Sequence, residues 1–205
     1  MAPLLIGLTG GIAAGKSEAL EAFGRLGAET VSSDAVVHEL LDSEQVRDRL
    51  IERWGPQIAP DGAIDRSRVG EIVFERPEEL AWLEAELHPR VAERIDAWRQ
   101  SLGPATDFGV VEVPLLFETA MADAFDVTVA VVADDDTRRA RAEQRGHALV
   151  EERAARQLDQ DEKAARADHV VRNEGSLADL ELQLSDLLAK LEHPGGRSGS
   201  EPVQR

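Results

Sequence analysis

One stretch of the chain has residue types and spacing suited to binding phosphate, GLTGGIAAGKS at residues 7–17. Gly10, Gly15, Lys16 and Ser17 fit the spacing G-x-x-x-x-G-K-[ST]. Glycines let successive backbone N–H groups turn toward one anion, and a helix that follows directs its positive end at the same charge. The pattern predicts that Lys16 reaches the outer phosphates of a nucleotide and that the Ser17 hydroxyl ligates Mg²⁺.

The elements around this loop are those that the motif requires. Residues 4–8, LLIGL, form an apolar run typical of a short buried strand. Residues 18–26 carry apolar side chains at helical spacing. The alternative is a glycine-rich turn without a ligand, which would not need a strand before it and a helix after it.

A carboxylate follows the next predicted strand. Residues 29–31 form a short strand that ends at Ser32-Ser33-Asp34, and residues 35–41 have helical spacing. Asp34 therefore lies at the carboxyl end of a strand, where open α/β sheets place their sites. The alternative is that Asp34 serves only as the N-cap of the helix.

Residues 43–98 differ from the rest, because they are rich in Glu and Arg and contain no convincing strand. Helical spacing predicts a mostly helical insertion, interrupted at Gly55-Pro56, at residues 60–62 and at Pro77. The pair His88-Pro89 predicts a further turn or helix start. A lone histidine there is more often structural than catalytic.

Three further strands are predicted, at residues 108–113, 126–132 and 169–172. They alternate with helices, so the sheet should be largely parallel. Pro114 ends the first of them, and Asp134-Asp135-Asp136 caps the helix that follows the second. Ser176 caps a last amphipathic helix, and residues from 193 onward have the Pro/Gly/Ser-rich composition of a disordered tail.

Two arginine-bearing helices are predicted at residues 137–145 and 150–160, on either side of Gly146-His147. Arg138, Arg139, Arg141 and Arg145 lie on the first of these helices. Such a pair could close as a lid over a polyphosphate. An exposed, salt-bridged helix pair explains the charges equally well.

Composition limits the classes of function. The 205 residues include 40 acidic and 23 basic ones, with a net charge of −17, which argues against binding to nucleic acid or to anionic membranes. Cysteine is absent, so disulfides and thiol chemistry are excluded, which suits a cytoplasmic protein. Neither a transmembrane segment nor a signal peptide is expected. We expect a monomer or a weak homo-oligomer.

The predicted topology brings the phosphate loop, Asp34 and the segment after Pro114 to one edge of the sheet. A kinase needs an acceptor pocket, a carboxylate near the acceptor hydroxyl and exclusion of water, and the chain has candidates for each. A switch GTPase should carry Asn-Lys-x-Asp. The one asparagine, Asn173, is followed by Glu174 and Gly175, which excludes that class.

The motifs together resemble the dephospho-coenzyme A kinase family. The resemblance rests on the loop GLTGGIAAGKS, on Asp34 before a helix, on Leu87-His88-Pro89, on VPLLFE at residues 113–118, on the Arg141/Arg145 helix and on Asn173-Glu174-Gly175. It covers residues 4–192. It implies phosphoryl transfer from ATP to the ribose 3′-hydroxyl of dephospho-coenzyme A, the last step of coenzyme A synthesis.

The resemblance also implies an α/β fold with a P-loop NTPase-type three-layer αβα core, a parallel sheet, a helical substrate-binding insertion and a lid. The core would comprise residues 1–42, 104–137 and 164–192. The helical coenzyme A domain would comprise residues 43–103, the lid residues 138–163 and the disordered tail residues 193–205.

Roles for individual residues follow from the same resemblance. Asp34 would orient or deprotonate the 3′-hydroxyl, Lys16 with Mg²⁺ would neutralise the γ-phosphate, and Arg141 would stabilise charge on the transferring group with support from Arg145. The remaining ATP-binding residues would be Gly11, Ile12, Ala13, Ala14, Gly15, Ser17, Asn173 and Gly175. Those that contact the acceptor would be Thr9, Asp34, His38, His88, Pro114, Leu115, Leu116 and Glu118.

The chain departs from the family pattern at three places. Ala13 stands where glycine is usual, and Ser32-Ser33-Asp34 keeps only the second carboxylate of the usual Asp-Ala-Asp. His38 replaces an arginine and would bind phosphate more weakly at neutral pH. Glu112 is placed to help position Mg²⁺, but the family varies there.

Two alternatives to this function stay open. One is another small-molecule P-loop kinase, which would act on a nucleoside monophosphate or on a metabolite hydroxyl. The other is a nucleotide-binding protein without turnover, which the departures at Ser32 and His38 would suggest.

Overall fold

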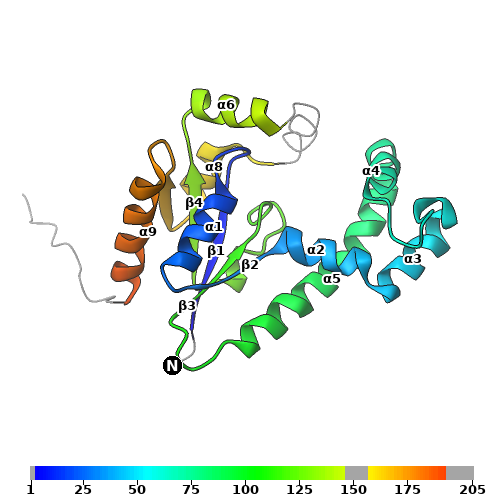
Figure 1. Cartoon of the computed structure of the whole chain (residues 1–205), viewed down its shortest axis with the longest axis horizontal. Helices are drawn as coiled ribbons and strands as arrows, with labels where there is room; N and C mark the ends of the chain where they lie inside the picture. The colour runs from blue at the N-terminus through cyan, green and yellow to red at the C-terminus, as the bar shows by residue number, and fades with distance from the viewer. Residues whose placement is uncertain (1–2, 146–156, 193–205) are drawn as a thin grey trace, which may run out of the picture.

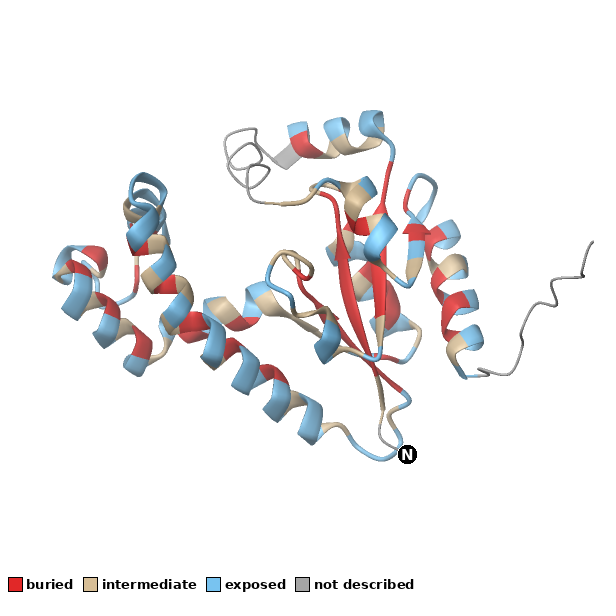
Figure 2. Cartoon of the chain, turned by 180° about the vertical axis from the view of Figure 1, so that it is seen from behind, coloured by how far each residue is buried: buried red, intermediate tan, exposed pale blue. Residues whose placement is uncertain are grey.

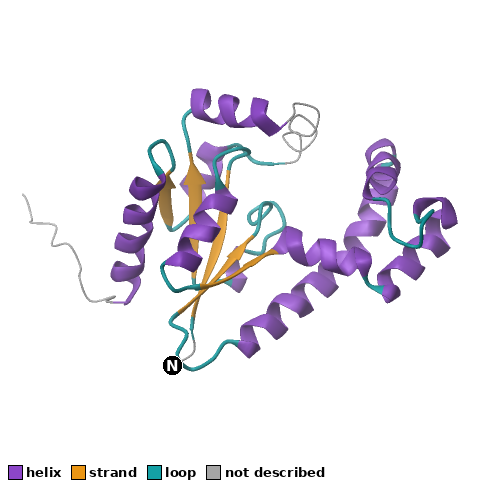
Figure 3. Ribbon diagram, in the orientation of Figure 1, coloured by secondary structure: helices purple, strands orange, loops and turns teal. Residues whose placement is uncertain are grey.

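The computed structural model of the chain describes residues 3–145 and 157–192 and is built around a five-stranded sheet (Figures 1 and 3). All neighbouring strands are parallel, in the order β2-β3-β1-β4-β5, which confirms the predicted sheet. The strands are β1 (Leu4–Gly10), β2 (Glu29–Ser32), β3 (Phe108–Glu112), β4 (Val127–Val132) and β5 (His169–Arg172).

Helices cover both faces of the sheet, which gives the predicted three-layer core. On one face lie α1 (Lys16–Arg25) and α9 (Leu177–Glu192), which pack against each other (Figure 1). Their buried side chains, such as Phe23 and Leu184, share a cluster with Ile6 and Val110 of the strands. On the other face lies α8 (Gln160–Arg166), which packs against β4 and β1. The central strands β1, β3 and β4 are buried between these layers, whereas the edge strands β2 and β5 are mostly exposed or half-buried (Figure 2).

A helical insertion separates β2 from β3 and extends away from the sheet (Figure 1). It comprises α2 (Ser33–Asp42), α3 (Glu44–Trp54), the short 3-10 helix η1 (Pro56–Ile58), α4 (Arg66–Glu75) and α5 (Pro77–Ser101). The predicted interruptions are confirmed: α3 ends at Gly55 with a φ of 85°, and α5 begins at Pro77. A second core cluster joins these helices to the sheet through Leu5, Val111 and Leu116.

The prediction of a turn or helix start at His88-Pro89 is wrong, because both residues lie in the middle of α5. Proline removes one backbone donor from a helix interior and usually breaks it. Here Leu87 and Val91, four residues apart, are both buried in the insertion core, so packing outweighs the lost hydrogen bond. The Arg90 guanidinium also donates to the Glu86 carbonyl oxygen in this turn.

After β3 the chain turns through η2 (Ala122–Ala124) into β4, and then enters α6 (Asp135–Arg145). The Asp134 carboxylate accepts from the Thr137 N–H at 2.8 Å, which confirms the predicted cap of α6. The predicted helix at residues 150–160 lies mostly outside the described residues. Where the structure resumes, residues 157–159 are not helical, and Gln160 begins α8 instead.

The end of the predicted lid at residue 163 falls inside α8, which packs on the sheet. Residues 160–163 therefore belong spatially to the core. Sequence periodicity missed α8, because its seven residues are too few for a clear apolar repeat. None of the described helices combines the length and apolar composition needed to cross a bilayer.

Candidate active site

The loop between β1 and α1 has the backbone conformation of an anion-binding nest. Gly10, Ala13 and Gly15 have positive φ values of 153°, 60° and 93°. Residues with positive φ that alternate with residues of negative φ turn neighbouring N–H groups toward one point. Gly10 has no alternative, because a Cβ there would lie 2.2 Å from the Val131 carbonyl oxygen of β4. Ala13, the departure from glycine, adopts the same left-handed conformation at a cost of about 1 kcal/mol.

Lys16 begins α1 and folds its side chain back over the loop. Its Nζ atom donates to the carbonyl oxygens of Gly10 at 3.3 Å and Gly11 at 3.0 Å. The next residue, Ser17, is exposed in the first turn of the same helix. A cation and a hydroxyl are thus placed at the positive end of a helix, beside the nest.

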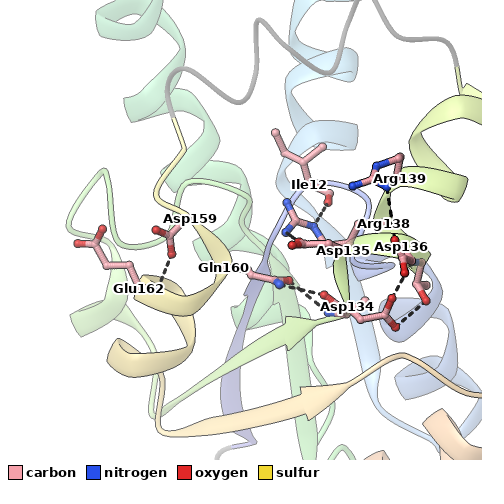
Figure 4. A network of polar contacts seen from close by, with 11 residues as sticks. Ile12, Asp134, Asp135, Asp136, Arg138, Arg139, Asp159, Gln160 and Glu162 are labelled. Atoms are coloured by element: carbon pink, nitrogen blue, oxygen red, sulfur yellow. Dashed lines mark hydrogen bonds and ion pairs between the residues drawn. The ribbon is translucent and has the colours of Figure 1, made fainter.

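The outer side of the loop is braced by side chains from distant elements. Arg141 of α6 donates to the Ala14 carbonyl oxygen at 3.2 Å and to the Asn173 carbonyl oxygen at 3.1 Å. The Asn173 side chain, which is buried, donates to the Ala14 carbonyl oxygen at 3.1 Å. Arg138 donates to the Ile12 carbonyl oxygen at 3.1 Å (Figure 4). Arg138 and Arg141 thus donate to carbonyl oxygens of the loop. The N–H groups of the loop are not used by these contacts and stay available to an anion in the nest.

Gln160 completes this brace from α8. Its side-chain amide accepts from the Ala133 N–H at 3.2 Å and donates to the Ala133 carbonyl oxygen at 2.9 Å (Figure 4). A Cβ on Gly11 would lie 2.9 Å from the Gln160 Cβ, so Gly11 permits this close approach. The loop is therefore held between α6, α8 and the turn after β5.

Some of the residues predicted to bind the nucleotide lie close together in the structure, whereas their roles stay predictions. Arg141 and Asn173 meet directly at the loop, as their assignment to one site requires. Gly175 lies in the turn before α9, where a Cβ would come within 2.7 Å of Asp179. The side chain of Arg145 lies outside the described residues. No described contact joins Gly175 to the loop.

Asp34 is exposed in the first turn of α2, directly after β2. The helix N-cap is Ser32, so the interpretation of Asp34 as a simple N-cap is wrong. Beside it, Glu112 ends β3 in register with Leu8 of β1 and Ser32 of β2. An exposed and a buried carboxylate thus share the carboxyl edge of the sheet.

Glu112 is buried, and burial raises the pKa of its carboxyl group above the ordinary value. The positive charge of Lys16 and a hydrogen bond with Ser32 lower that pKa, while the negative charge of Asp34 raises it. Because the charges of Lys16 and Asp34 both affect this pKa, Glu112 lies near both side chains. The sequence signal for Glu112 is its position at the end of a predicted strand, and its burial follows only from the packing of β3 between β1 and β2.

The segment after β3 contributes backbone and a carboxylate to the same edge. The Thr9 hydroxyl donates to the Pro114 carbonyl oxygen at 3.4 Å, and Glu118 accepts from the Leu158 N–H at 2.8 Å. The predicted acceptor contacts need one correction. Thr9 and Leu116 are fully buried, so their side chains fill the core and present no surface to a substrate. Pro114 and Leu115 are half-buried.

The two histidines predicted to contact the acceptor lie on the insertion. His38 is exposed on α2 and His88 is exposed on α5, and these two helices pack against each other. Both side chains are thus accessible to a ligand. The described contacts place neither of them at the phosphate loop, and their role stays a prediction.

The donor set at the loop suits a metal that enters with a nucleotide. Within residues 3–145 and 157–192, no cluster of three or more His, Asp, Glu or Cys side chains could hold a metal by itself. Mg²⁺ is commonly bound through one or two protein oxygens together with substrate phosphates and water. The Ser17 hydroxyl, with Glu112 nearby, fits that mode.

The fold and the loop together define a P-loop phosphotransferase-type α/β protein. The sequence model of dephospho-CoA kinase matches residues 4–179, which is most of the chain. A dephospho-CoA kinase of Protochlamydia amoebophila is 37% identical over 193 residues, which cover 91% of this chain and 95% of that protein. The chain belongs to the dephospho-CoA kinase family.

Two solved structures support the same relationship. The structure of TT1252 from Thermus thermophilus has a TM-score of 0.78 and 32% identity, covering 93% of this chain and 99% of that one. The dephospho-CoA kinase from Campylobacter jejuni has a TM-score of 0.65 and 26% identity, covering 93% of this chain and 98% of that one. These matches extend through the core and the helical insertion.

Proposed function

We propose that the chain transfers the γ-phosphoryl group of ATP to the 3′-hydroxyl of the ribose of dephospho-CoA. The observation that carries this proposal is the braced nest before α1, with Asp34 at the end of β2 on the same edge of the sheet. In the reaction, the 3′-oxygen attacks the γ-phosphorus and the bond from phosphorus to the β,γ-bridging oxygen breaks. The hydroxyl proton passes to Asp34, and ADP leaves.

The protein contributes mainly position and charge to such a transfer. The loop N–H groups hold the β-phosphate, and Lys16 exchanges its contacts with Gly10 and Gly11 for phosphate oxygens. Ser17, with support from Glu112, would hold a Mg²⁺ ion that enters with the nucleotide, and this ion would supply further neutralisation of phosphate charge.

Arg141 and Asn173 have a role that their contacts suggest. Both side chains donate to the carbonyl oxygen of Ala14 and so fix the loop. Arg141 also places a permanent positive charge beside the loop. This charge stabilises the transferring group. Arg145, Gly175 and Ile12 to Ala14 complete the proposed ATP site.

The helical domain at residues 43–103, with His88, would bind the acceptor together with His38 of α2 and with Pro114, Leu115 and Glu118 after β3. We also propose the lid at residues 138–163, without its last four residues, which belong to α8 and pack with the core. The reaction would take place in the cytoplasm, where ATP is available, and the protein would act as a monomer or a weak homo-oligomer.

A coupled ADP-release assay tests the proposed function. Dephospho-CoA should stimulate ADP release strongly, whereas AMP, CMP and shikimate should give only background rates. Stimulation by one of the other acceptors instead would assign a different small-molecule kinase. Tight ATP binding without release of ADP for any acceptor would leave a nucleotide-binding protein without turnover.

A further inference from the structure

Lys163 of α8 is a fully buried cation within the described chain, with an exposed fraction of 0%. Its Nζ atom lies 3.0 Å from Glu118 Oε1 and also donates to the Pro114 carbonyl oxygen. An ammonium group in the interior is costly unless it is paired and hydrogen-bonded. The proposed phosphoryl transfer assigns no role to this lysine, so its burial needs another explanation.

The choice of lysine is itself informative. The chain has 20 arginines and only three lysines, and its exposed ion pairs are mostly formed by arginine. A compact ammonium with three donors fits between one carbonyl and one carboxylate, whereas a planar guanidinium needs more room. The space between the Pro114 carbonyl oxygen and the Glu118 carboxylate therefore suits a compact ammonium group.

The contacts of Lys163 converge on the segment that follows β3. The Pro114 carbonyl oxygen receives both the Lys163 ammonium and the Thr9 hydroxyl, and Thr9 directly precedes the first glycine of the phosphate loop. Glu118 Oε1 receives Lys163 and the Leu158 N–H. The Lys163 side chain therefore fixes both ends of residues 114–118 against α8, and Thr9 joins the first of these ends to β1.

The second oxygen of Glu118 has no such partner. Within the described residues, Glu118 Oε2 is buried and accepts no hydrogen bond. A buried carboxylate oxygen without a donor is costly, and in a native structure it calls for an explanation such as a water molecule, an ion or a role in the reaction. With Oε1 held by Lys163, the rotation of the carboxylate is fixed and Oε2 is left to accept from an N–H or O–H group.

We propose that Lys163 is a positioning residue for the acceptor substrate: it holds Pro114 and Glu118 so that this segment binds the dephospho-CoA side of the reaction. The inference rests on the proposed function, since it assigns a task within that site. It predicts that loss of Lys163 impairs acceptor binding far more than ATP binding, because the hydrogen bonds from distant elements to the carbonyl oxygens of the nest come from Arg138, Arg141 and Asn173 and none comes from Lys163 within the described residues.

The test uses the full chain and the variants Lys163→Met, Glu118→Gln and the double variant. Lys163→Met alone leaves a buried carboxylate unpaired and should lower the melting temperature. The double variant removes both charges and should recover most of that loss. In both Lys163 variants, kcat/KM for dephospho-CoA should fall roughly ten- to hundredfold, as expected for a misplaced binding segment. KM for ATP should stay within about twofold, since the side chains that donate to the phosphate loop are left in place.

Asp168→Asn is the matched control. Asp168 accepts from the N–H and the hydroxyl of Thr128 near the amino end of β4, away from the carboxyl edge. This variant should lower stability without changing KM for dephospho-CoA.

Two results would overturn the inference. One is recovery of acceptor KM together with stability in the double variant, which would make Lys163 a structural residue only. The other is an equal rise of KM for both substrates. If the wild-type chain does not phosphorylate dephospho-CoA at all, the proposed function fails instead, so the two failures are distinguishable.

Discussion

The guanidinium of Arg141 donates to the carbonyl oxygen of Ala14 at 3.2 Å, although 127 positions separate the two residues. The same guanidinium nitrogen also donates to the Asn173 carbonyl oxygen at 3.1 Å. Helix α6 is thereby joined directly to the phosphate loop and to the turn after β5. Any movement of α6 that removes Arg141 would release the loop on its carbonyl side, so helix position and nucleotide binding should be coupled.

Substitution of Arg141 by alanine should therefore affect both binding and chemistry. We expect weaker ATP binding and a fall in kcat of about a hundredfold, since a loop contact and the charge proposed to stabilise the transferring group are both lost. Arg139→Ala is the control, because Arg139 is exposed and forms an ion pair with Asp136 on the same helix. Steady-state kinetics with ATP titration measure both effects, and equal behaviour of the two variants would refute the assignment.

Asp34→Ala should separate binding from turnover. The carboxylate is exposed and does not contact the phosphate loop in the described structure, so ATP affinity by calorimetry should be nearly unchanged. Turnover should fall by about a hundredfold or more, as for loss of a general base. Asp42→Ala, at the other end of α2, should keep normal turnover. Unchanged turnover in Asp34→Ala would show that the carboxylate has no part in the reaction.

Gly10→Ala tests the geometry of the loop. The added Cβ would lie 2.2 Å from the Val131 carbonyl oxygen, a backbone atom that cannot move aside. We expect unfolding free energy to fall by roughly 2–3 kcal/mol, as for other overpacked sites. Gly103→Ala is the control, since no atom lies within 4 Å of its Cβ position. Denaturant unfolding measures both, and equal stability of the two variants would contradict the described loop.

Glu112 should make stability depend on pH in a defined direction. Burial raises its pKa in the folded state, so the folded protein holds the proton more tightly than the unfolded chain does. Stability from this group is therefore present at low pH and is lost as pH rises through the folded pKa. Glu112→Gln should raise the melting temperature relative to wild type at pH 7.5, and the difference should shrink toward pH 4.

The same variant should lower kcat, because the proposed role of Glu112 beside Lys16 and Mg²⁺ needs its charge. A gain in stability with normal kcat would make Glu112 a tolerated buried acid without a role in the reaction. A loss of stability at pH 7.5 would mean that its hydrogen bond with Ser32 outweighs the cost of burial.

The sequence predicted those parts of the fold that depend on local patterns. The strands, the glycine loop and the position of Asp34 after β2 follow from apolar runs and from turn residues close in sequence, and the structure confirms them. The prediction at Pro89 is wrong because packing of Leu87 and Val91 outweighs the local tendency of proline to break a helix.

The contacts that complete the site could not be predicted in the same way. The hydrogen bond from Asn173 to Ala14 depends on the order of the strands, and no local sequence pattern predicts this contact. Lys163 offered one signal, its rarity in a chain that otherwise uses arginine, but its burial depends on α8 packing against the sheet.

The most direct measurement is a crystal structure of the protein with dephospho-CoA and a non-hydrolysable ATP analogue. The triphosphate should lie in the nest at residues 11–15, and a carboxylate oxygen of Asp34 should lie about 2.6–3.2 Å from the ribose 3′-oxygen. A nest without the triphosphate, or a 3′-oxygen far from Asp34 with that carboxylate facing solvent, would contradict the proposed reaction.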